Sequence, residues 1–401
     1  MKSKGLCGKG IVSLIEEWIS NMFGILLSAL GLLVLLMVVD YIFGMMAVPK
    51  EAYENPNDRK YGWRRIMADT KKEHYVPRCY LKNFIQNNGR IQVFDKYKVQ
   101  VRSQNIMDVA MENYFYDIKF DDLLKQVDEK EKIKSDLMDI VGTEEWQDVL
   151  VALDEKHFAC AETIYSTLLQ KIIEKSYDGN QWVIDNCRAC SLMEKEFMSL
   201  FIAIQIIRTK TVRDTLSDTM QKMYQTLSYK MQMHEENALP KDAFKVEVNK
   251  DFVKLQHSNM ILDEEVAVQM AETLNNHIWV MYVNKTDCSF YTSDNPVANI
   301  PHKFDKYRSY GGLKSEGIEI VFPITPKLML AMYDRNRYDK VFSDRQFAIL
   351  STIEEVEYYN RVQVFNSNRC VFSGQSNFGL AEKLCKEHPK LQSYQSRVEV
   401  G

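Results

Sequence analysis

The stretch IWVMYVNKTDCSFYTSDNPV, residues 278–297, marks a change in the period of the hydrophobic pattern. IWVMYVN is rich in β-branched and aromatic residues, and the turn NKTD separates it from CSFYTSDNPV, so two strands are predicted here. IEIVFPITPKLMLAMYD, residues 318–334, predicts another pair of strands around Pro323 and Pro326. The residues 343–368 are predicted to be helical, and CVFSG at 370–374 predicts a short strand.

The chain before this point has a helical pattern. Between about residues 120 and 275, long stretches lack Gly and Pro and place apolar residues at a spacing near 3.6. Nearer the N-terminus, RIQVFD (90–95) and KVQVRS (98–103) alternate as the strands of a hairpin do. The sequence therefore predicts an α+β fold with a mostly helical middle and a C-terminal, mainly antiparallel sheet.

Composition gives a broad class. The 401 residues are 46% hydrophobic and 26% charged, which is normal for a globular protein, and the net charge of −4 does not indicate nucleic-acid binding by the whole chain. Eight cysteines show no paired framework, which favours a reducing compartment. The one CxxC, Cys187 to Cys190, lies at the start of a predicted helix. Ordinary half-buried thiols are a better interpretation of it than a zinc or redox site.

An apolar run near the N-terminus predicts one transmembrane helix. No charged residue occurs from Met22 to Val39, and the run continues past Asp40 to Val48, which is long enough to cross a bilayer. A signal peptide would have a shorter apolar region. More Lys and Arg follow the run than precede it, so the large C-terminal part is expected to be cytoplasmic, in a single-pass protein of the cell membrane.

The predicted organisation follows from this run. Residues 1–48 form an amphipathic segment and the transmembrane helix, 49–72 a basic juxtamembrane linker, 73–384 a cytoplasmic α+β domain, and 385–401 a polar tail. Gly24, Ser28 and Gly31 would permit close helix packing, and hence a homo-oligomer, although small residues are also simply tolerated in lipid.

The same segment resembles a known family. LLVLLMVVDYIFGMMAVPKEAYENPNDRKYGW, residues 32–63, is similar to the first span and following loop of a phage holin family that is also linked to toxin secretion. The resemblance covers about residues 11 to 65 and stops where such holins continue into further membrane helices. It implies an anchor related to holins, whereas one span alone cannot build a holin pore.

Three polar clusters occur where a plain core would not need them. The first is HYVPR with its neighbour Tyr80: His74, fixed by the following proline turn, is a candidate general base or metal ligand, and Arg78 and Tyr80 are candidate binding residues. A structural histidine is the plainer interpretation.

The second cluster, TSDNP, follows an apolar strand. Asp294 would bind a cation or hold a base, with Ser293 and Asn295 as binding residues, unless these side chains only cap backbone N–H groups in a turn.

The third cluster is Gln205 and Arg208, which share one face of an apolar helix. This pair would bind a phosphate or carboxylate. Clamping of the Asp294 turn is a slightly better interpretation, because buried polar groups need partners inside the protein.

These clusters carry a second resemblance, over about residues 73 to 378. HYVPRCYLKNF, FIAIQIIRTKTVR, FYTSDNPV, FPITPKLML and YYNRVQVFNSNRCVFS occur in the order of a bacterial domain family of unknown function. The resemblance implies that the family's motif residues here are His74, Pro77, Tyr80, Gln205, Arg208, Ser293, Asp294, Asn295, Pro296, Pro323 and Asn360. It implies no activity.

Two functional hypotheses follow. In the first, the domain is a hydrolytic effector in phage–host conflict, such as a nuclease or phosphodiesterase acting on nucleic acid or nucleotides. His74 would be the base or a ligand, Asp294 the ligand of a divalent metal ion, and Arg208 the phosphate contact. In the second, the domain is a non-catalytic sensor or partner-binding module, and the holin-like segment acts at the membrane. Convergence of His74, Arg208 and Asp294 in one cleft would favour the enzyme.

Overall fold

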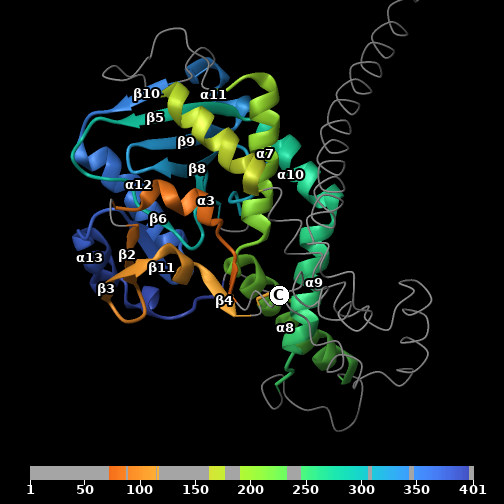
Figure 1. Ribbon diagram of the computed structural model, residues 1–401. Helices are drawn as coiled ribbons and strands as arrows, with labels where there is room; N and C mark the ends of the chain where they lie inside the picture. The colour runs from red at the N-terminus through yellow and green to blue at the C-terminus, as the bar shows by residue number, and fades with distance from the viewer. Residues whose placement is uncertain are drawn as a thin grey trace, which may run out of the picture. The chain divides into compact units, whose positions relative to one another are not determined.

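The computed structural model describes residues 72–86, 89–113, 115–116, 162–176, 190–232, 245–305, 309–342 and 347–396 (Figure 1). All of them belong to one compact unit, formed by Thr70–Asp154 and Glu162–Gly401. The predicted transmembrane helix and the segment that resembles a holin lie outside the described residues. Within these residues, no helix has both the length and the apolar character needed to cross a membrane.

The larger sheet has five strands in the order β10-β5-β9-β8-β7. They are β10 (Phe347–Leu350), β5 (Ile278–Asn284), β9 (Leu328–Tyr333), β8 (Ile318–Thr325) and β7 (Ala298–Pro301). β5, β9, β8 and β7 pair antiparallel, and only β10 pairs parallel with β5. The strands predicted at 278–284 and 318–334 are therefore present. The register shifts between Pro323 and Thr325, where a proline without an N–H cannot continue the ladder.

A second sheet joins distant parts of the chain in the order β3-β2-β11-β6. Its strands are β3 (Gln100–Asn105), β2 (Arg90–Asp95), β11 (Cys370–Ser373) and β6 (Thr292–Ser293), all antiparallel. The predicted hairpin is β2–β3. The predicted C-terminal sheet did not include this hairpin, which in the structure pairs with β11. A strand along all of CSFYTSDNPV was also wrong: only two residues pair before the chain turns at Asp294.

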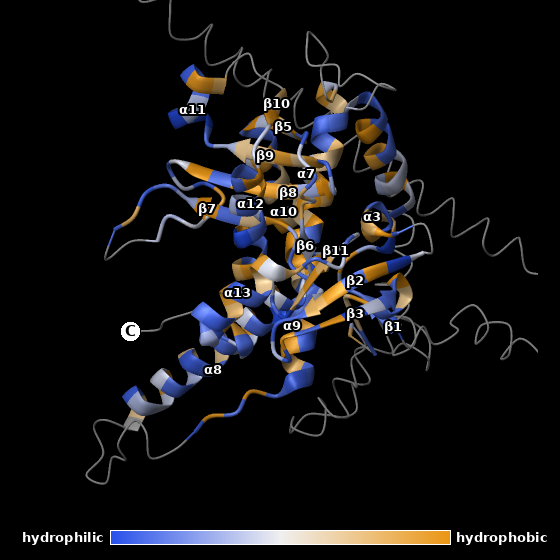
Figure 2. Ribbon diagram, turned by 90° about the vertical axis from the view of Figure 1, so that its left-hand side faces the viewer, coloured by the Kyte–Doolittle hydropathy of each residue, from blue (hydrophilic) through white to orange (hydrophobic). Residues whose placement is uncertain are grey.

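Helices surround the sheets. They are α3 (Arg78–Leu81), α7 (Leu192–Ile207), α8 (Lys210–Gln232), α9 (Lys250–Leu262), α10 (Glu264–Asn276), α11 (Arg335–Phe342), α12 (Ile353–Asn366) and α13 (Gly379–Glu387), with 3₁₀ turns η2 (Lys82–Phe84), η3 (Ile106–Asp108) and η4 (Pro389–Gln392). Residues 162–176 are also helical. A two-stranded ribbon pairs β1 (Lys72–His74) with β4 (Met111–Asn113). Figure 2 shows β8 and β9 in the colours of apolar residues, as expected for buried strands.

The stretch 343–368, predicted to be helical throughout, begins differently. Residues 347–350 form β10, because the short apolar run FAIL adds an edge to the larger sheet beside β5. The helix α12 begins only after Thr352, whose side chain accepts a hydrogen bond from Glu355 N while the Glu355 side chain bonds back to the cap. A capping box therefore sets the boundary that periodicity alone did not show.

Helix α12 belongs to both cores. Val356 and Tyr359, near its start, pack in the hydrophobic cluster of the larger sheet. Val364, two turns later, packs with Phe94, Val371 and Phe378 in the cluster of the smaller sheet. One helix therefore joins the two sheets, and its polar face passes the TSDNP turn.

Candidate functional site

The TSDNP turn is held by hydrogen bonds to the loop before β11. Asp294 is 2% exposed, and its Oδ1 accepts a bond from Asn368 N (2.8 Å) while its Oδ2 accepts from Arg369 N (2.8 Å) and Cys370 N (2.7 Å). Burial raises the pKa of Asp294, and the backbone N–H bonds act in the opposite direction. Both carboxylate oxygens are thus engaged by the protein's own backbone.

A row of amide side chains on α12 holds the other side of this segment. Asn360 accepts from Tyr291 N (2.7 Å) and donates to Ser289 O (2.9 Å). Gln363 donates to Pro296 O (2.9 Å) and accepts from the hydroxyl of Ser293 (3.0 Å). Asn366, the last residue of α12, continues the row. Its side-chain amide donates to the carbonyls of residues 295 and 297, and the Asn295 side chain donates to the Asn366 carbonyl (3.0 Å). Spacing of three residues puts all three amides on one face.

Gln205 and Arg208 hold the HYVP segment instead of the Asp294 turn that we expected them to clamp. The Gln205 amide donates to Tyr75 O (3.3 Å). The Arg208 guanidinium donates to His74 O (2.5 Å) and forms an ion pair with Glu162 (2.9 Å). Arg208 ends helix α7 and is 3% exposed, so its charge is used inside the domain. Its pKa is raised: burial acts to lower it, but its neighbours, among them Glu162, outweigh that effect.

His74 lies beside this pair and keeps one unused atom. Its Nε2 is buried and has no hydrogen-bond partner among the residues that the structure describes. Burial and the positive charge of Arg78 lower the pKa of His74, so the imidazole is neutral at pH 7. Arg78 is exposed, unlike Arg208, and is the cation next to His74 that faces solvent.

Tyr80 is fully buried and joins α3 to both sheets. Its hydroxyl lies 2.6 Å from the Thr292 hydroxyl of β6 and donates to Pro323 O of β8 at 2.6 Å. Its ring stacks on Phe322 with centroids 4.9 Å apart. Such a side chain stabilises the fold and is not open to a ligand.

The three predicted catalytic residues do not meet through any described contact. His74 and Arg208 are neighbours, but no hydrogen bond or ion pair between described residues joins either of them to Asp294. Their assignment to catalysis stays a prediction. Among the residues that the structure describes, no group of three or more His, Cys, Asp or Glu side chains is arranged to hold a metal ion. The expected divalent cation likewise stays a prediction.

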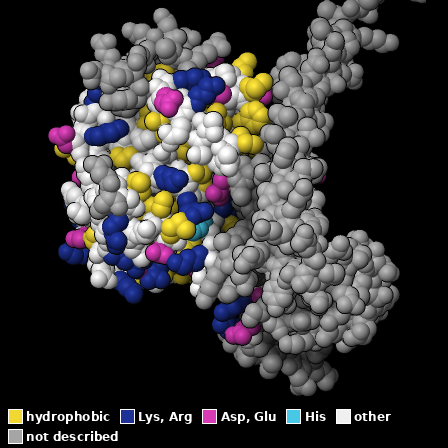
Figure 3. Space-filling model, in the orientation of Figure 1, with side chains coloured by type: hydrophobic (Ala, Val, Ile, Leu, Met, Phe, Trp, Pro, Cys, Tyr) yellow, Lys and Arg dark blue, Asp and Glu magenta, His cyan; other side chains and the backbone are white. Residues whose placement is uncertain are grey.

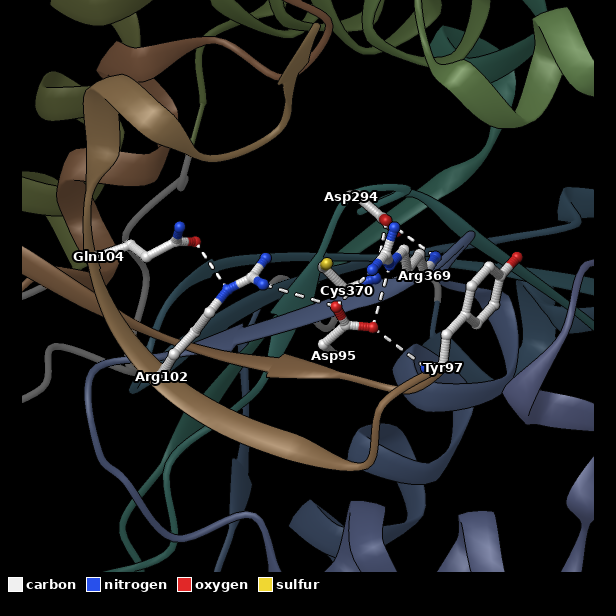
Figure 4. A network of polar contacts seen from close by, with 7 residues as sticks. All are labelled: Asp95, Tyr97, Arg102, Gln104, Asp294, Arg369 and Cys370. Carbon is white, nitrogen blue, oxygen red and sulfur yellow. Dashed lines mark hydrogen bonds and ion pairs between the residues drawn. The ribbon is translucent and has the colours of Figure 1, made fainter.

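A second charged network, which the sequence pattern did not indicate, lies beside the TSDNP turn (Figure 4). Asp95 is fully buried at the end of β2 and forms two bonds with the Arg369 guanidinium (3.0 and 2.7 Å), and Arg102 approaches it at 3.5 Å. Burial acts to raise the pKa of Asp95, but the Arg369 hydrogen bond and charge lower it overall. Asp95 is the last residue of β2 and shares the apolar face of that strand. A carboxylate on an apolar face was the feature of the sequence that could have revealed this network.

Basic side chains gather on the surface around this network. Figure 3 shows Lys and Arg side chains around β2 and β3, with few acidic residues among them. Arg102 and Arg369 expose 37% and 41% of their side chains, but each contacts Asp95. Asp95 therefore partly neutralises the positive charge of both arginines, and the network has a structural role.

These elements define an α+β domain with two sheets joined by one helix and held by buried polar side chains. The profile of DUF4238, a protein family of unknown function, matches residues 72–377. The chain belongs to this family. No curated protein and no solved structure matches the chain. The holin-like residues lie outside the matched range.

Proposed function

We propose that residues 72–377 form a sensor or partner-binding module. The observation that carries this proposal is the use of Asp294: both of its oxygens bond to backbone N–H groups of the same domain. Arg208, Asn360 and Gln363 are used in the same way. Side chains whose hydrogen bonds hold the fold together stabilise a surface. They are poorly placed to give up those bonds and contact a substrate instead.

We also propose that the apolar run at residues 22–48 anchors this module to the cell membrane, with the module in the cytoplasm. The proposal rests on the length of the run and on the excess of Lys and Arg after it. A C-terminal fusion tests the orientation. Fluorescence of a green fluorescent protein fusion supports it, and activity of an alkaline phosphatase fusion, which requires export, contradicts it.

A second candidate function, a hydrolase, is favoured by one observation. Within the described part of the chain, the buried Nε2 of His74 has no hydrogen-bond partner, and a neutral imidazole with an unused nitrogen is what a general base needs. Arg78 would then contact the anionic group of the substrate. Asp294 has no direct role in this version of the hypothesis.

One comparison separates the two functions. The purified full-length chain is incubated with RNA, DNA and bis-p-nitrophenyl phosphate, with and without Mg²⁺ or Mn²⁺. The module predicts that product release is equal for the wild type and His74→Gln. The matched control is His388→Gln, because His388 is exposed and lies outside the motifs. Hydrolysis that His74→Gln abolishes, at an unchanged unfolding midpoint, and that His388→Gln keeps, would replace the module by the hydrolase.

A further inference from the structure

Asp214 of α8 is a half-buried carboxylate beside the loop that the TSDNP turn holds. Its Oδ2 accepts a hydrogen bond from the side-chain amide of Asn368 at 2.8 Å. The backbone N–H of the same asparagine donates to Asp294, also at 2.8 Å. Asn368 therefore bridges two carboxylates and fixes the position of Asp214 beside the TSDNP turn.

The cations nearest to Asp214 in the sequence are bonded to other groups. Lys210, one turn earlier on α8, forms an ion pair with Glu112 of β4. The Arg213 guanidinium donates to Nδ1 of His257 (3.1 and 2.9 Å). Among the described residues, none forms an ion pair with Asp214 or a hydrogen bond with its Oδ1. Burial raises the pKa of Asp214, and its one hydrogen bond and the charge of Lys210 offset only part of that effect. This carboxylate therefore lacks a positive partner.

The hydroxyl of Tyr75 is a second acceptor near this carboxylate. The side chain is only 7% exposed, yet no described residue forms a hydrogen bond with its hydroxyl. The ring packs on Phe115 with centroids 5.1 Å apart, and Arg213, the residue before Asp214, lies over the same Phe115 ring at 3.5 Å. Burial, and after it the charges of Asp294 and of other acidic groups that include Asp214, raises the pKa of Tyr75. The phenol oxygen therefore lies within electrostatic range of both carboxylates and keeps its proton.

The two acceptors define the chemistry of a ligand. Because Asn368 occupies Oδ2, Asp214 offers one oxygen. A guanidinium group prefers parallel bonds to both oxygens of a carboxylate, whereas an ammonium group is a compact charge with three separate donors. One carboxylate oxygen and one hydroxyl oxygen therefore suit an ammonium group better than a guanidinium group. A divalent metal ion would need several oxygen ligands, and within the described part of the chain Asp214 belongs to no group that could supply them.

We propose that Asp214 and the Tyr75 hydroxyl form a binding site for an ammonium group, carried by a lysine side chain of a partner protein. Asp214 Oδ1 accepts one N–H of this group and the phenol oxygen accepts a second. Asn368 is the positioning residue that holds Asp214. Asp294 acts on the site only through Asn368, because both of its own oxygens are already bonded. The choice of a protein lysine rests on the partner-binding module proposed above, whereas ammonium binding at Asp214 does not.

Saturation-transfer difference NMR measures the binding of small amines to the full-length chain in a non-ionic detergent. Methylammonium chloride replaces sodium chloride at constant ionic strength, and the methyl signal reports the bound cation. We expect saturable binding that Asp214→Asn weakens about tenfold, because a hydrogen bond to a charged group is lost. This variant keeps an acceptor for Asn368, so the fold should be maintained. Asp218→Asn, one turn further along α8, is the matched control and should leave binding unchanged. Equal binding by the wild type and Asp214→Asn overturns the site.

Tyr75→Phe separates a ligand contact from a structural role. Since no described residue bonds to this hydroxyl, its removal should leave the urea unfolding midpoint unchanged and weaken methylammonium binding several-fold. A lower midpoint with unchanged binding removes Tyr75 from the site. Tetramethylammonium has the charge but no N–H donor, and weaker binding of this ion is expected. Equal binding of tetramethylammonium, or tighter binding of methylguanidinium, overturns the assignment of an ammonium group.

Two further probes test the source of the ammonium group. Nα-acetyl-lysine methylamide carries it on a peptide unit, and n-butylammonium carries it without one. Tighter binding of the lysine derivative supports a protein partner. Equal or tighter binding of n-butylammonium overturns that source and indicates a free amine. Hydrolysis that depends on His74 would instead replace the module. Because His74 is not part of the site, that result leaves methylammonium binding at Asp214 unchanged, so the two failures are distinguishable.

Discussion

Replacement of Asp294 by Asn tests what the TSDNP turn does. The asparagine side chain has nearly the same shape and keeps one oxygen. Its NH₂ group takes the place of Oδ2, which accepts two N–H bonds in the wild type, so donors there face another donor. Net hydrogen bonds to a charged group contribute about 1.5–3 kcal/mol each, so the loss of two costs about 3–6 kcal/mol. Removal of a buried charge offsets part of that cost, because burial disfavours the anion.

The expected net destabilisation is therefore about 2–4 kcal/mol. Urea unfolding of the full-length chain, followed by tryptophan fluorescence, measures it, and a shift of the midpoint by about 1 M is expected. Asp287→Asn is the matched control, because Asp287 is exposed and lies before β6. It should change the free energy of unfolding by less than about 0.5 kcal/mol. An equally small change for Asp294→Asn would refute a structural role for this carboxylate.

Three further changes probe other parts of the polar framework. Tyr80→Phe removes a buried hydroxyl with two partners, and we expect a loss of about 1–2 kcal/mol and a lower Tm by calorimetry. Arg369→Gln removes the bonds that lower the pKa of Asp95. The Asp95–Arg369 pair stabilises the wild type above the pKa that Asp has in the unfolded chain, and this stabilisation is lost as the pH falls through the lower pKa of Asp95 in the folded protein. The variant should therefore lose less stability than the wild type on acidification below pH 5. Burial and a neighbouring arginine lower the pKa of His257 to about 4. Between that value and the unfolded pKa of about 6.5 the unfolded chain binds more protons, so stability should fall as pH drops through this window, and His257→Gln should flatten that dependence. Equal pH profiles of variant and wild type would contradict either pH prediction.

Local pattern predicted much of the sheet structure. β-branched and aromatic runs marked β5, β8, β9 and the hairpin β2–β3, because alternation and turn residues are local signals. The pairing of β2 with β11 was not predictable in the same way. It joins residues that are 275 to 281 positions apart, and no local feature of either strand indicates which strand it pairs with. β10 was missed because a run of four apolar residues fits a helix or a strand equally well.

The candidate residues show a similar limit. The sequence identified Asp294, Arg208 and His74 as polar groups in apolar surroundings, and all three are buried or half-buried. What the sequence did not contain was the identity of their partners. Backbone N–H and C=O groups have no residue signature, so a carboxylate that holds a loop and one that holds a metal ion look alike in a sequence. Asp214 and Asn368 are 154 positions apart in the sequence, and only the folded chain brings them together.

The most direct test of the account is amide hydrogen exchange at residues 368, 369 and 370, measured by NMR or mass spectrometry. Asp294 binds these three backbone N–H groups in the structure. We therefore expect slow exchange of all three in the wild type and faster exchange in Asp294→Asn, with β5 and β9 unchanged under the same conditions. Rapid exchange in the wild type, or equal exchange in the variant, would show that the carboxylate is not committed to this loop and would return Asp294 to the list of candidate catalytic residues.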